Sequence, residues 1–240
     1  MKKSLLVLSL LSALALSSSA DDRSWNWSPL GVGIAAPVQL PFMETDVYGI
    51  RFGGLFGCNR NVYGIDVGLA EICSNESVGN FAGIQASALS WTEGNAYGLQ
   101  FGVLANVVKG STFAWQTAFA NAVWEDCRGL QFGAINYTVG LKGLQFGLVN
   151  WNELASYGLD IGLINANQMD FAGWSFGAIV NYADTYRGFA CGLVNCAYDV
   201  TGFQLGLINA CDHMHGVQIG LINLICGSPL PIMVLANAWF

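Results

Sequence analysis

The pentapeptide CDHMH, from Cys211 to His215, holds the residues of this sequence that are best suited to binding a metal ion. In an extended strand the side chains of Cys211, His213 and His215 would lie on one side, because successive side chains alternate between the two faces. One thiolate with two imidazoles suits zinc or copper. The alternative, which we favour, is an ordinary turn that contains the two histidines of the chain, so we predict neither a metal nor any other cofactor.

Motifs for catalysis are missing from the sequence. It contains no GxSxG nucleophile elbow, no HExxH zinc motif and no P-loop, and its two histidines are the only imidazoles that could serve a catalytic triad. Glycines are frequent, but they recur within predicted strands and do not lead into a helix as a phosphate-binding loop would. We therefore expect a protein that is not an enzyme, and we identify no small-molecule ligand.

A second set of polar residues recurs at one position of a repeated phrase, two residues after its first glycine. In GLQFGLVN, which spans 143–150, this residue is Gln145. On a sheet that closes around a lumen, such side chains would set the charge of the lumen and hence its preference for solutes. On an open sheet they would be solvated. The members of this polar face that we single out are Arg51, Asp66, Gln100, Gln131, Gln145, Asp160, Gln204 and Gln218.

The repeated phrase is the main feature of the chain. Twelve copies fill about 47–225, at intervals of 14 to 16 residues except for one of 19. Residues one, three and five after the first glycine are apolar and the one at position two is usually polar, which predicts a strand. A second glycine stands at position four in most copies. Asn closes nine consecutive copies, from Asn106 to Asn223, and we expect the strand to end there in a turn.

Two all-β architectures fit this repeat. The first, which we favour, is an antiparallel up-and-down meander or barrel of about 14 strands, because the segments between copies resemble turns and strands of this length can cross a bilayer. In it, Leu, Ile and Phe would face lipid, and Gln and Gly a lumen. The alternative is a parallel β-solenoid with one repeat per coil, Leu and Phe inside and Asn stacked in a ladder. The similarity of all the turns favours this alternative.

Substitutions on the two faces of the strand should have different effects. In either architecture Phe146→Asp should be costly, because it places a charge in lipid or in a core. Gln145→Asp should be tolerated, because Gln145 is expected on the polar face.

The seven cysteines also bear on the architecture. Cys58 and Cys73 occupy the same phase of neighbouring copies. Stacked coils would bring them together, and a disulfide between them would then be expected. Neighbouring antiparallel strands would separate them by roughly 20 to 25 Å, beyond the reach of a disulfide.

The beginning of the chain reads as a secretory signal peptide over 1–20, with two lysines, an apolar run and small residues before a cut after Ala20. We divide the rest into an N-terminal segment with a first strand, 21–46, and a β-repeat domain with a closing C-terminal strand, 47–240. Without the signal, seven basic residues (nine minus two) face sixteen acidic ones. This charge argues against nucleic acid as a partner, and no later run of about twenty apolar residues predicts a membrane-spanning helix.

The opening APVQLPFMETDVYGIRFGGLFGCNRNVYGIDVGL, the series of GLQFGLVN-type copies and the ending LPIMVLANAWF resemble a group of uncharacterised exported bacterial surface-repeat proteins whose copies read GLQIGLIN. The resemblance implies a protein of the cell envelope and supplies no catalytic residues. We therefore expect export to the outer membrane or cell surface, contact with membrane lipid, and a structural role or limited passage of solutes, with self-association also open. The alternative is a secreted β-solenoid that serves as a binding or scaffold module.

Overall fold

The computed structural model describes residues 27–35, 38–41, 43–73 and 79–240. The predicted signal peptide, 1–20, lies outside these residues. The described part is built from strands and turns, and it contains no helix that could span a membrane. Its strands are β1 (Trp27–Ala35), β2 (Val38–Leu40), β3 (Asp46–Asn59), β4 (Val62–Cys73), β5 (Phe81–Thr92), β6 (Ala96–Val108), β7 (Thr112–Thr117), β8 (Ala120–Phe132), β9 (Ile135–Phe146), β10 (Val149–Asn152), β11 (Ser156–Ile225) and β12 (Ile232–Trp239).

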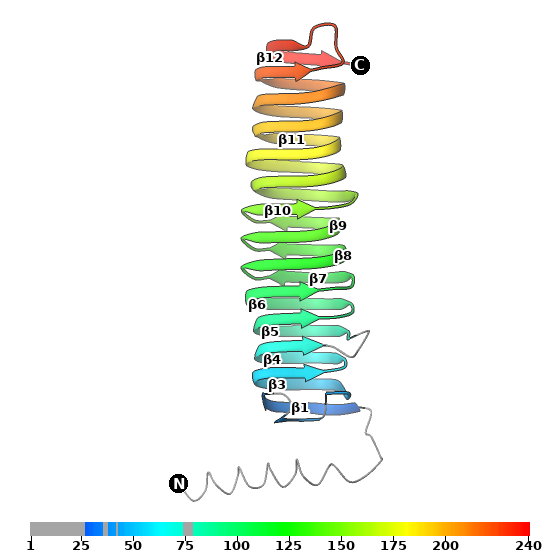
Figure 1. The fold of residues 1–240 in the computed structure, drawn as a ribbon, viewed down its shortest axis with the longest axis vertical. Helices are drawn as coiled ribbons and strands as arrows, with labels where there is room; N and C mark the ends of the chain where they lie inside the picture. Colours follow the sequence, from blue (N-terminus) through cyan, green and yellow to red (C-terminus); the bar gives the residue numbers. More distant parts are fainter. Residues whose placement is uncertain (1–26, 36–37, 42, 74–78) are drawn as a thin grey trace, which may run out of the picture.

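The chain forms a parallel β-solenoid, an elongated stack of coils that climbs from β1 to β12 (Figure 1). Each copy of the repeat pairs in parallel with the next copy and in the same phase, so that Gly49 lies opposite Gly64 and Gly64 opposite Gly83. The antiparallel meander or barrel that we favoured from the sequence is therefore wrong, and the alternative solenoid is right. One repeat makes one coil, which explains why all the connections between copies look alike.

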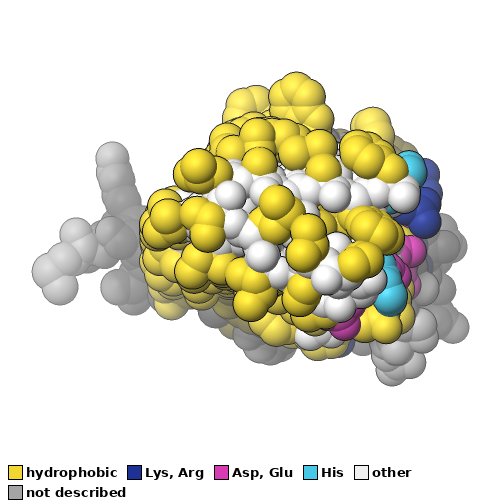
Figure 2. All heavy atoms as spheres, turned by 90° about the horizontal axis from the view of Figure 1, so that it is seen from above, with side chains coloured by type: hydrophobic (Ala, Val, Ile, Leu, Met, Phe, Trp, Pro, Cys, Tyr) yellow, Lys and Arg dark blue, Asp and Glu magenta, His cyan; other side chains and the backbone are white. Residues whose placement is uncertain are grey.

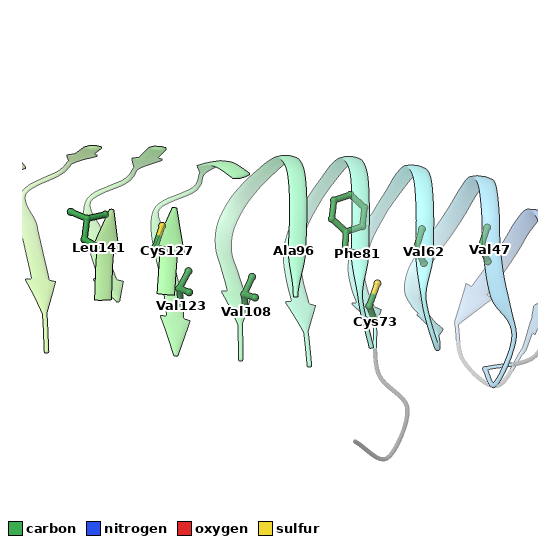
Figure 3. Packing of buried hydrophobic residues seen from close by; sticks show 9 residues of the cluster. All are labelled: Val47, Val62, Cys73, Phe81, Ala96, Val108, Val123, Cys127 and Leu141. Carbon is green, nitrogen blue, oxygen red and sulfur yellow. The ribbon is translucent and has the colours of Figure 1, made fainter. Parts of the chain in front are cut away.

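The segments between copies, which we interpreted as turns, form the return wall of each coil. They can do so because most contribute an inward apolar residue two positions before the first glycine of the next copy, with the small polar Thr112 and Ser156 at that position in two coils. A further inward row comes from residues just beyond the closing Asn. Figure 3 shows both rows in the first half of the stack. The buried cluster there consists of Val47, Val62, Cys73, Phe81, Ala96, Val108, Val123, Cys127 and Leu141.

The other wall of the coil, formed by the repeated phrase, has the opposite polarity to the one expected for a solenoid. Gln145 is fully buried, whereas Leu148 is exposed and Phe146 is partly exposed. The predicted Asn ladder is present, but Leu and Phe lie outside, not inside as we expected. The interior instead combines two amide rows on this wall with two mainly apolar rows on the return wall.

The two glycines of the phrase allow this close packing. The first has a positive φ in most coils, for example 141° at Gly64, and a Cβ there would overlap the carbonyl group of the preceding coil. The second lies where the chain bends, as between β9 and β10. A Cβ at Gly147 would overlap the side chain of Asn136. The chain thus turns at the second glycine, and the closing Asn continues the strand with its side chain in the core.

Additional strands flank both ends of the stack. At the N-terminal end β1 pairs in parallel with β3, and β2 pairs antiparallel with β1. At the C-terminal end β12 turns back and pairs antiparallel with the last coil, with Gly216 opposite Trp239. Each terminal coil therefore has a partner for part of its sheet edge, which an open parallel stack would leave free to associate with other strands.

Candidate functional surface

The predicted polar face forms a ladder of hydrogen bonds inside the solenoid. From Gln100 to Gln145, each glutamine donates from Nε2 to Oε1 of the glutamine in the preceding coil, at 2.7 to 3.0 Å, and Gln85 accepts the first of these bonds. Gln218 donates to Gln204 in the same way at 2.9 Å. The side chains on this ladder that we singled out are all at most 2% exposed, so in the described coils they contact one another and not a partner or an open lumen.

A second ladder of asparagines runs alongside with its donors pointing the other way. Asn106 donates from Nδ2 to Oδ1 of Asn121 in the following coil at 3.0 Å, and the pattern continues to Asn223. Several of these amides also donate to a backbone carbonyl, as Asn150 does to Ile161. Because the two rows are antiparallel in direction, their amide dipoles oppose each other.

The glutamine ladder ends at its N-terminal side in an ion pair. Gln85 donates to Asp66, and the guanidinium of Arg51 holds the same carboxylate with two hydrogen bonds of 2.7 Å. Arg51 also lies 3.1 Å from a carboxylate oxygen of Glu71, which takes the place of Asn in the second ladder. All three charges are almost fully buried. Burial raises the pKa of Glu71 to about 7, against the opposing effect of Arg51.

Asp160 interrupts the glutamine ladder in its middle. It lies opposite Gln145 and is fully buried. Its Oδ2 accepts hydrogen bonds from Asn152 and Asn167, at 3.2 and 3.3 Å, while its Oδ1 and the Oε1 of Gln145 have no hydrogen-bond partner. Burial raises the pKa of Asp160 to about 7, and the two asparagine hydrogen bonds oppose this shift. A protonated Asp160 carries the hydroxyl donor that the oxygen of Gln145 lacks.

The three metal candidates do not come together. Cys211 points into the core beside Met214, with the two sulfur atoms 4.0 Å apart. His213 lies against the ring of Tyr198 and His215 against the ring of Phe240, both on the outside. The strand bends between Cys211 and Met214, so the alternation that we assumed does not hold. No cluster of three possible metal ligands of the His, Cys, Asp and Glu types occurs among the described residues.

The predicted disulfide is also wrong, although the coils do stack. Cys58 lies opposite Ile72, and Cys73 lies opposite Asn59. The two cysteines are thus one residue out of register, and all seven cysteines are free thiols. A shift of one residue is enough to prevent a disulfide between them, because it turns one of the two side chains to the other face of the sheet.

The outer surface of the solenoid is where the molecule exposes its apolar side chains. Between the first glycine and the closing ladder position of each copy, the four charged residues point inward and are buried; they are Arg51, Asp66, Glu71 and Asp160. The outward positions there carry Leu, Ile, Val, Phe and Trp in most coils. Some form regular stacks, such as Phe132 on Phe146, with parallel rings 4.7 Å apart.

Exposed charges gather along a different side, in the segments that precede each first glycine. Figure 2, which looks down on the stack, shows hydrophobic side chains around most of the outline and charged or histidine side chains together on one edge. Examples are the ion pair of Lys109 with Glu93 at 2.6 Å and the exposed Asp184. We call this side the charged edge and the wall of repeated phrases the apolar face.

No protein-family description, no curated protein and no solved structure matches this chain. Two features of the coil were not predicted from the sequence. The first is the inward rows of the return wall, and the second is that the Leu and Phe columns point outward. The signal for the first was present, since an apolar or small residue recurs two positions before most first glycines.

Proposed function

We propose that this chain is a non-enzymatic, exported β-solenoid scaffold that binds its partner through the apolar face. The observation that carries the proposal is the absence of outward charge on the phrases of the described coils, next to an edge where the exposed charges gather. Soluble monomers rarely expose contiguous apolar patches larger than a few hundred Å², and larger ones mark interaction sites.

The interior supports a structural role for the polar residues. The amides of Gln131 and Asn136, for example, are used in holding coil to coil, and this leaves them no group for catalysis. In the described coils the ladder side chains occupy the space that we had assigned to a lumen, so passage of solutes is not part of the proposal. The signal peptide predicted over 1–20 and the resemblance to exported surface-repeat proteins support export.

Photo-crosslinking in living cells tests the proposal. A photo-reactive amino acid replaces Leu207, which is 54% exposed on the apolar face, in the full chain expressed in a bacterium. The matched control replaces Tyr198, 56% exposed on the charged edge. We expect crosslinked products from Leu207 and few from Tyr198, in protein recovered outside the cytoplasm. Products from neither site, or from Tyr198 only, would contradict a binding role for the apolar face.

A further inference from the structure

The best-defined part of the apolar face is a column of leucines at the fifth position after the first glycine. Its members in the C-terminal half are 41 to 57% exposed; they are Leu148, Leu163, Leu193, Leu207 and Leu221. In these five copies the next residue is a valine or isoleucine, and Ile208 and Ile222, for example, are exposed. Two outward apolar residues in succession arise because the chain bends at the preceding glycine.

The column belongs to a surface large enough for a stable protein interface. Six residues of each phrase cover about 20 Å of chain at about 3.3 Å each, and twelve strands at about 4.8 Å stack to about 55 Å. Their product is about 1,100 Å² of mainly apolar surface, which includes the parts of the phrase on both sides of the bend at the second glycine. A stable protein interface removes about 800 Å² from each partner, and the largest apolar patch of a typical monomer is about 300 to 600 Å².

The regularity of the face favours one occupant. The outward side chains recur at the strand spacing, and the ridges they form run the length of the stack. A surface with the same repeat can interleave with them over that whole length, as paired sheets do in a steric zipper. A second copy of this chain carries that repeat by necessity. With no outward charge on the phrases of the described coils, two copies can meet there without bringing like charges together, and the charged edges remain in water.

We infer that the apolar face is the contact between two copies of this chain, packed sheet against sheet with their leucine columns at the centre. This inference rests on the proposed function, and it names the partner of that same surface. The geometry predicts a symmetric pair, since a face that matches itself is buried most simply about a twofold axis.

Sedimentation of the purified protein, produced as the full chain and exported by the host, tests the inference. We expect the wild type to be a dimer at micromolar concentration. The variant Leu193→Glu with Leu207→Glu places two charges at the centre of the contact, and we expect its dissociation constant to rise at least about 100-fold. The control Met169→Glu with Tyr198→Glu alters two similarly exposed residues on the charged edge and should leave the dimer intact.

A second measurement separates the possible outcomes. Circular dichroism and thermal unfolding should show that both double variants keep the wild-type fold, because the four replaced side chains are exposed. A monomeric wild type, or a dimer unaffected by the leucine variant, would overturn the inference. If a monomeric wild type floats with phosphatidylcholine vesicles and the leucine variant does not, lipid is the occupant and the proposed binding role survives. A monomer that binds no vesicles and gives no crosslinks from Leu207 would remove both proposals.

Discussion

Replacing Asp160 by Asn should stabilise the solenoid at high pH and leave it nearly unchanged at low pH. The substitution keeps the shape of the side chain and supplies an N–H donor where Asp160 Oδ1 now faces the ladder without a partner. The remaining oxygen can still accept from Asn152 and Asn167. The variant therefore copies the protonated form of the wild type and cannot ionise.

The magnitude follows from the pKa of Asp160, which burial raises from 3.8 to about 7 in the folded protein. Below about pH 4 the carboxyl group is protonated in both states, and its contribution to stability is fully present. As the pH rises, the unfolded chain ionises first, so this contribution is lost progressively until the pH passes the folded pKa near 7. The rise of the pKa from 3.8 to about 7 corresponds to about 4 kcal/mol over the whole pH range.

Urea unfolding followed by circular dichroism measures this effect at about pH 4.5, 6 and 8. We expect the variant to gain about 3 kcal/mol over the wild type between pH 4.5 and pH 8, because about 1 kcal/mol of the full effect is already lost at pH 4.5, where the unfolded carboxyl group is mostly ionised. Glu71, whose pKa is also raised to about 7, contributes equally to both proteins and cancels in the difference. The control Asp170→Asn removes an exposed carboxylate and should show no such trend. A difference that does not grow with pH would refute the assignment of Asp160 as a neutral ladder member.

Three further predictions concern the faces of the coil. In urea unfolding Gln145→Asp should cost at least about 2 kcal/mol more than Phe146→Asp, because it places a charge in the core; the reverse order would contradict the ladder. Gly202→Ala should lower the free energy of unfolding by at least about 2 kcal/mol, because φ is 140° and a Cβ meets the preceding coil. A maleimide should label the exposed Cys226 and spare the buried Cys73 in the native protein; equal labelling would contradict this burial.

The sequence was sufficient to predict an all-β repeat protein, the length of the unit and the row of asparagines. It was not sufficient for the direction of successive strands, because alternation of apolar and polar residues in a phrase such as 143–150 is the same in parallel and antiparallel sheets. The similarity of the turns was the better guide. The inward residues of the connections, such as Val62 and Leu141, are single apolar residues in polar segments, so they recur once per copy but produce no apolar–polar alternation within a segment.

The polarity of the coil was the harder part to predict. The usual expectation that Leu and Phe lie inside fails here because buried Gln and Asn satisfy one another from coil to coil, which removes most of the cost of burying an amide. That compensation depends on every coil having the same residue in register, as Gln100, Gln116 and Gln131 do. The expectation that Cys211, His213 and His215 would share one side of a strand was wrong because the chain bends between Cys211 and Met214. This bend breaks the alternation of side chains that a straight strand would have.

In this solenoid the amide rows lie inside and the apolar rows outside, and hydrogen exchange of the glutamine side-chain amides, followed by NMR on the folded protein, distinguishes this polarity from its reverse. We predict that the Nε2 protons of Gln100 and Gln131 are protected, with Gln131→Glu used to assign the signal that disappears. Exchange at the rate of a free glutamine side chain in the folded protein would show that these amides face water and that the amide rows are not the interior of the coil.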